Sequence, residues 1–122
     1  MRWILISAAI LGAASIILGA ALKHSVASGD VEILQTALRY HQIHSVVLLA
    51  LGLFALERVY DRWFYVSAGL FIAGIFIFSG SLYLMVLYAM PVFGNFTPIG
   101  GMCFIAGWLS LIFVKINKTQ SQ

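Results

Sequence analysis

Four long apolar runs, separated by short polar segments, set the pattern of this chain. The first run, residues 3–22, contains Ser7 and Ser15 as its only polar side chains. At a rise of about 1.5 Å per residue, a helix of this length matches the roughly 30 Å hydrocarbon core of a bilayer. Arg2 and the alanines near the end of the run are also typical of a signal peptide, whose apolar region is usually only about 7–15 residues long. We therefore expect a retained transmembrane helix.

The second run begins with an amphipathic segment. Residues 28–30, Ser-Gly-Asp, are typical of a turn that ends in a helix N-cap at Asp30, and the apolar positions that follow recur at helical spacing. The mainly apolar part, residues 43–56, is short for a membrane span. The sequence therefore predicts one continuous helix over residues 31–57, with its first turns at the membrane interface.

The third and fourth runs are separated by a turn that begins at Pro91. Residues 63–90 would extend about 42 Å as a single helix, which is longer than a bilayer core, so we expect this helix to tilt, protrude or break. The natural place for a bend is Ser-Gly-Ser at 79–81. Thr97, which is followed by a proline, is predicted to be the N-cap of a last helix over residues 97–114.

Composition and charge support a membrane protein. Hydrophobic residues make up 62% of the 122 residues and charged residues 9%, against roughly one-quarter charged in ordinary soluble domains. We expect an all-α, polytopic protein: a compact bundle of four transmembrane helices in a single domain over residues 1–122. The net charge of +3 is spread over the short polar segments, so the pattern gives no support for nucleic-acid binding.

Small residues four positions apart indicate close packing of helices, within one chain or between chains. These pairs are Ala8/Gly12, Ser15/Gly19, Gly69/Ala73 and Cys103/Gly107.

The distribution of positive charge predicts the orientation. With four spans, both termini and the loop at 57–62 lie on one side of the membrane. That side carries Arg2, Arg58, Arg62, Lys115 and Lys118, whereas the opposite side carries Lys23 and Arg39. The positive-inside rule therefore predicts that both termini are cytoplasmic.

The same alternation brings polar residues of all four helices to the outer side. Candidate members of a ligand site or polar network are Tyr40, His44, Ser79, Ser81, Tyr83 and Thr97, with Lys23 and Arg39 at its mouth. Tyr40 and His44 are four apart and share one helix face. An ionisable residue inside the membrane is a functional candidate, although a histidine that only joins two helices satisfies the same physics. Trp108 lies deep in its helix and also needs a partner for its indole N–H.

A haem or metal site is a narrower alternative that would use His24, His41 and His44. His41 and His44 are three apart on one helix, but no recognised ligand pattern accompanies them, so we predict no metal and no cofactor.

No set of nucleophile, base and orienting acid is apparent either, and the sequence does not indicate an enzyme. We expect a non-enzymatic accessory or structural protein that interacts with the lipid bilayer, with partner membrane helices or with a second copy of itself. The alternative is a binding or transport site for a lipid, quinone, proton or small ligand in the outer half of the bundle.

Three stretches resemble a known family. They are Thr-Ala-Leu-Arg-Tyr-His-Gln-Ile-His at 36–44, Phe-Ser-Gly-Ser-Leu-Tyr-Leu at 78–84 and Thr-Pro-Ile-Gly-Gly-Met-Cys-Phe-Ile-Ala-Gly-Trp at 97–108. With their order and the chain length, they resemble the domain of unknown function 423 family, which includes small bacterial YgdD-like membrane proteins and is related to the animal transmembrane protein 256. The resemblance implies a four-helix inner-membrane protein without an assigned activity. The resemblance also implies a histidine in the first helix, at the position where this chain has Ala20. Because this chain lacks that histidine, a site that pairs a first-helix histidine with His44 is not expected.

Overall fold

The computed structural model describes residues 2–116 and consists of four helical spans. Each span is long and apolar enough to cross a bilayer: Trp3–Lys23, Ser28–Glu57, Arg62–Tyr88 and Pro91–Phe113. The first is helix α1 (Trp3–Lys23), and the second contains a short 3₁₀ turn, η1 (Ser28–Asp30), and helix α2 (Val31–Glu57). The chain is therefore an all-α integral membrane protein. Lys118, which the charge analysis places on the cytoplasmic side, lies outside the described residues.

The third span is helical throughout but changes its winding. Helix α3 (Arg62–Gly74) is followed by a π-helical segment, η2 (Ile75–Ser79), and by helix α4 (Gly80–Tyr88). The irregularity thus ends at Ser79, the first residue of the Ser-Gly-Ser segment at which the sequence predicts a bend. The span ends at Ala89, which has a left-handed conformation (φ 53°, ψ 36°).

The fourth span begins with a 3₁₀ segment, η3 (Pro91–Phe96), and continues as helix α5 (Thr97–Ser110) and a final turn, η4 (Leu111–Phe113). The prediction that Thr97 is the N-cap is wrong, because Phe96 holds that position and Thr97 is already helical. The 3₁₀ turns continue directly into α5, so its N-terminus needs no side-chain cap. Asp30 does hold the N-cap position of α2, but its side chain makes no capping hydrogen bond.

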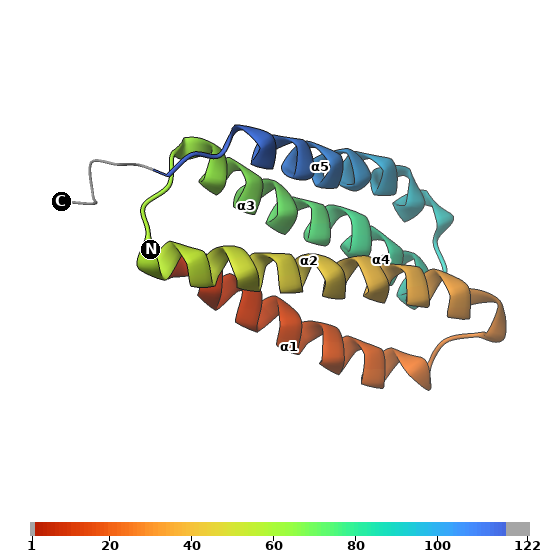
Figure 1. Cartoon of the computed structure of the whole chain (residues 1–122). Coiled ribbons are helices and arrows are strands. Elements are labelled where there is room, and N and C mark those ends of the chain that lie inside the picture. The colour runs from red at the N-terminus through yellow and green to blue at the C-terminus, as the bar shows by residue number, and fades with distance from the viewer. Residues whose placement is uncertain (1, 117–122) are drawn as a thin grey trace.

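The spans alternate in direction across the bundle (Figure 1). The start of α1, the connection from α2 to α3 and the end of α5 lie at one end, here called the Arg58 end; the α1–α2 connection and η3 lie at the other, the Lys23 end. Helix α1 packs mainly on α2, and α3 packs mainly on α5. Helix α2 also contacts α3, η2 and α4, so it joins the two pairs.

Two apolar clusters hold the helices together. The larger one includes Ile4 of α1, Leu48 of α2, Phe71 of α3 and Phe104 of α5, all at most 4% exposed. The smaller one, nearer the Lys23 end, is built around Ala37 of α2 and Leu82 of α4. Because lipid replaces water around the outside, large aliphatic side chains are exposed on every span, and the buried interior is a narrow seam.

Glycines set the closest helix contacts. A Cβ built on Gly52 of α2 would lie 2.7 Å from the Cα of Leu5 on α1, and one on Gly107 of α5 would lie 2.8 Å from the Phe71 ring. The predicted pair Cys103/Gly107 therefore lies in a helix interface at Gly107. Gly69 is exposed and its added Cβ would meet nothing within 4 Å, so the pair Gly69/Ala73 does not bring helices of this chain together at that glycine.

Candidate functional site

The side chain of His44 lies in the middle of the bundle, between α2 and α5. The indole N–H of Trp108 donates to Nε2 of His44 at 3.1 Å, and Nδ1 of His44 lies 2.8 Å from the backbone oxygen of Tyr40. An indole N–H only donates and a carbonyl only accepts, so the neutral ring carries its proton on Nδ1. Both ring nitrogens of His44 are therefore occupied by groups of the protein, and Trp108 has the partner that the sequence analysis expects it to need.

Aromatic rings enclose this histidine. The Phe104 ring stacks on the imidazole with centroids 3.8 Å apart, and Phe71 packs at 5.5 Å in a tilted arrangement. His44 is 3% exposed. The ring therefore has a fixed position in a dry, aromatic environment, with no free nitrogen directed into a cavity.

His41 forms a second, separate centre between α1, α2 and α4. Its Nε2 lies 2.8 Å from the backbone oxygen of Leu11, and its Nδ1 lies 2.8 Å from the hydroxyl of Tyr83. The carbonyl can only accept, so Nε2 carries the proton and Nδ1 of the neutral ring accepts from Tyr83. This arrangement joins three helices through one buried imidazole. From the sequence, His41 is a candidate only for a metal site, so this role was not predicted.

Serine and threonine hydroxyls make further links near the Lys23 end. The hydroxyl of Ser79 donates to the backbone oxygen of Ala37 at 2.7 Å, which connects η2 to α2. The hydroxyls of Ser81 and Thr97 are 2.6 Å apart, and Ser81 also donates to the backbone oxygen of Phe78. The Ser81–Thr97 contact joins α4 to α5. These polar residues thus lie at helix interfaces in pairs and do not surround one common space.

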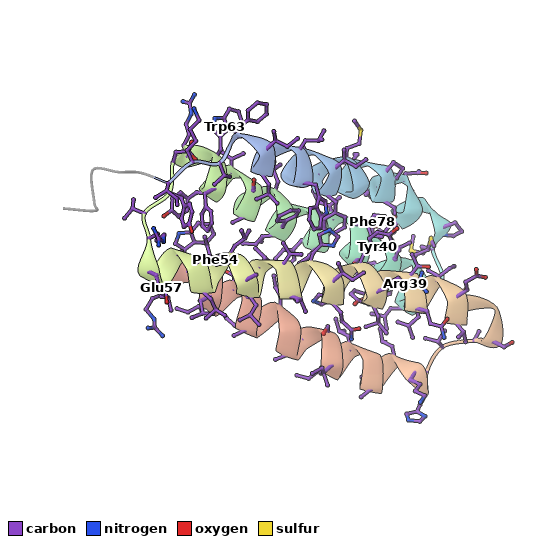
Figure 2. The ribbon with its side chains drawn as sticks, in the orientation of Figure 1. Arg39, Tyr40, Phe54, Glu57, Trp63 and Phe78 are labelled. Carbon is purple, nitrogen blue, oxygen red and sulfur yellow. The ribbon has the colours of Figure 1, made fainter. Side chains whose placement is uncertain are left out.

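The remaining candidates lie toward the outside of the bundle. Tyr40 is 38% exposed, and its ring contacts that of Phe78 with centroids 4.6 Å apart (Figure 2). Lys23 and Arg39 are exposed. Several of the eight candidate residues therefore form hydrogen bonds in the structure. Tyr83 is bonded to His41, Ser81 is bonded to Thr97, and the backbone oxygen of Tyr40 is bonded to His44. Ser79 is bonded to Ala37, which the sequence analysis does not single out.

The three histidines do not form a common metal site. In the described part of the chain, no group of three His, Cys, Asp or Glu side chains is placed to hold a metal ion. His24 is exposed at the end of α1, whereas His41 and His44 are each bonded at both nitrogens.

One hydroxyl of the described interior differs from the others. Ser67 of α3 is fully buried, and its Oγ has no hydrogen-bond partner among residues 2–116. It lies outside the candidate set, on the helix that supplies Phe64, Ala68 and Phe71 to the larger apolar cluster.

Comparison with known proteins identifies the family. The family described as "Protein of unknown function (DUF423)" matches residues 18–101. This chain belongs to that family. It is 38% identical over 120 residues to the UPF0382 inner membrane protein YgdD of Escherichia coli strain K12, an alignment that covers 95% of this chain and 91% of the relative.

Other relatives come from different bacteria. The UPF0382 membrane protein SAB0533 of Staphylococcus aureus is 34% identical over 97 residues, covering 79% of this chain and 77% of the relative. A UPF0382 membrane protein of Haemophilus influenzae is 35% identical over 92 residues, covering 75% and 73%. No solved structure matches this chain. The family identified from three sequence stretches is confirmed, and it is a family of integral membrane proteins of unknown activity.

Proposed function

We propose that this protein is a non-enzymatic structural or accessory component of a bacterial inner membrane, with both termini in the cytoplasm. The observation that carries the proposal is the bonding of the two buried histidines. Each places one nitrogen on a backbone carbonyl and the other on a side chain of a different helix. A general base or proton carrier needs a nitrogen that can reach substrate or water, and here that position is taken by Trp108 or Tyr83.

The orientation rests on charge, and the assignment to an inner membrane rests on the name of a relative. Arg2, Arg58, Arg62 and Lys115 lie at the Arg58 end, and the Escherichia coli relative is named an inner membrane protein. A fluorescent protein that folds only in the cytoplasm, fused after residue 122, is expected to fluoresce. A periplasmic phosphatase at the same position is expected to be inactive, and the reverse pattern would refute this orientation.

The histidine proposal is tested with purified protein in liposomes that contain a pH-sensitive dye. We expect a proton flux equal to that of protein-free liposomes and an absorption spectrum without a cofactor band. We also expect His41→Phe and His44→Phe to lower the free energy of unfolding, by about 1 kcal/mol for each interhelical bond lost. A flux or a bound chromophore that disappears in either variant, while the variant stays folded, would instead assign the histidines to transport or cofactor binding.

A second candidate, binding of an apolar ligand such as a quinone or a lipid chain, is supported by one observation. A groove of about 550 Å³ runs between α4, η2 and η3, and Phe76, Phe93 and Phe96 are among its lining residues. Ser81 and Tyr83 also line it. Its size is within the range of small-molecule pockets.

Gly80 offers a way to test this aromatic groove. Gly80 lines it, and a Cβ built there would meet no atom within 4 Å, so Gly80→Leu should fill the groove without disturbing the helix contacts. If the groove binds a ligand, the native protein should quench the fluorescence of a ubiquinone analogue added to the liposomes. The Gly80→Leu variant should bind the analogue at least about tenfold more weakly. Equal quenching by both proteins would remove this candidate.

A further inference from the structure

A groove of about 410 Å³ lies between α1 and α2 on the outside of the bundle. Small residues line it on both helices: Ala8, Gly12 and Ser15 on α1, and Ser45 on α2. A Cβ built on Gly12 would meet no atom within 4 Å, so the α1 backbone is open to close approach from outside. In a bilayer, where apolar burial does not drive helices together, such openings allow backbone-to-backbone packing.

The groove also contains one polar group whose bonding is incomplete. The hydroxyls of Ser15 and Ser45 donate to the backbone oxygens of Gly12 and His41 within their own helices. The side chain of Gln42 lines the groove and is exposed, and its amide has no hydrogen-bond partner among residues 2–116. A primary amide has two N–H donors and one carbonyl acceptor, and all of them lack partners here.

The depth of Gln42 makes this exposure costly. Glu57 lies at the charged Arg58 end of α2. At the helical rise per residue, Gln42 is about 22 Å from Glu57 along the helix, which places Gln42 inside a hydrocarbon core of about 30 Å. Figure 2 places Arg39 farther along α2, toward the Lys23 end. Acyl chains cannot hydrogen-bond, so an amide at this depth needs a polar partner, and residues 2–116 supply none.

We propose that the α1–α2 groove is the interface of a homodimer in the membrane, in which the Gln42 amides of two copies pair with each other. A two-fold axis brings the same residue of both chains together, and the primary amide is self-complementary because its N–H can donate to the carbonyl of its symmetry mate. The small residues around it, open at Gly12, let the second copy approach closely enough for this bond. This interface goes beyond the proposed structural role of the histidines and does not depend on it.

Cysteine cross-linking in liposomes tests the geometry. In a Cys103→Ala background, Val46→Cys places a thiol on the groove, one turn from Gln42. Oxidation should convert it to a covalent dimer. The matched control is Ile105→Cys, which is equally exposed to lipid but on α5, away from the groove, and should remain monomeric. Equal cross-linking at both positions would indicate random collision and overturn the proposal.

Substitutions test the chemistry. Single-molecule photobleaching of labelled protein across a dilution series in liposomes should give a dimer dissociation constant that rises about tenfold in Gln42→Leu. Gln42→Asn, which keeps an amide, should retain most of the affinity. Gln35→Leu is the matched control, because it removes an exposed amide from the same helix. Gln35 is about 10 Å farther from Glu57 than Gln42 is, which places it beyond the hydrocarbon core.

A further variant, Gly12→Leu, should block the dimer by filling the groove. At a dilution at which the native chain is monomeric, Gln42→Leu and Gly12→Leu should unfold at a temperature no lower than that of the native chain, since neither side chain is directed into the interior. A native chain that stays monomeric at every dilution overturns the proposal. Native mass spectrometry would then show whether a retained phospholipid or a different protein occupies the groove. The histidine experiments read proton flux and spectra, so the two proposals fail independently.

Discussion

The indole N–H of Trp108 on α5 donates a hydrogen bond to Nε2 of His44 on α2, across the middle of the bundle. These residues are 64 positions apart in the chain, and the bond fixes both the tautomer of the imidazole and the orientation of the indole. It connects the central helix α2 to the α3–α5 pair at a level where acyl chains surround the protein.

Trp108→Phe should therefore destabilise the protein. The ring remains aromatic, but Nε2 of His44 loses its donor in an apolar environment, and we expect the free energy of unfolding in micelles to fall by about 1 kcal/mol. Trp3→Phe is the control, since Trp3 has a similar exposed fraction, 41% against 46%, and is the first residue of α1. A double-mutant cycle with His44→Phe should give a coupling energy of about 1 kcal/mol; a value near zero would contradict this description.

Gly100→Ala should be strongly destabilising, whereas Gly101→Ala should not. A Cβ at Gly100 would lie 2.6 Å from the Cα of Phe78 and closer still to its backbone nitrogen, so α5 and η2 would have to separate. We expect a loss of about 1–3 kcal/mol, as for other overpacked interiors. The neighbouring Gly101 would place its Cβ 3.8 Å from the Phe78 ring, an ordinary contact. Comparable unfolding free energies for the two variants would show that this helix contact is looser than described.

Ala89→Gly should stabilise the protein. Ala89 ends α4 with φ of 53°, a left-handed conformation that costs an L-residue about 1 kcal/mol and that glycine adopts freely. Part of this gain is offset by the greater flexibility of glycine in the unfolded chain, so we expect a net increase of about 0.5 kcal/mol in unfolding free energy. Ala50→Gly, at an exposed position inside α2, should instead be destabilising by up to about 1 kcal/mol. Destabilisation by both changes would argue against the left-handed turn.

Much of the fold follows from the one-dimensional pattern. The apolar runs predict helices over residues 3–22, 31–57, 63–90 and 97–114, and the described residues form four spans, of which the fourth begins earlier, at Pro91. The reason is physical: a chain in hydrocarbon must satisfy its backbone hydrogen bonds within each span, so length and apolarity almost suffice to place a helix. The local details were harder, because the 3₁₀ turns before α5 displaced the expected cap at Thr97.

The polar residues could be assigned to a region but not to partners. Spacing places Tyr40 and His44 on one helix face, but it cannot show that His44 reaches Trp108 or that His41 reaches Tyr83 and Leu11. A useful signal was present for His41, since any imidazole buried inside a membrane must occupy both nitrogens. It could not reveal which helices supply the partners.

What the sequence by itself determined is the membrane solvent, the presence of four apolar spans, and the family. The tertiary structure decided that the expected polar patch consists of separate interhelical links, that Gly52, Gly100 and Gly107 set the helix contacts, and that Gln42 faces outward. The division has one cause. Spans are specified by the transfer of each segment into lipid, a property of neighbouring residues, whereas hydrogen-bond partners depend on how each helix is rotated and packed against the others.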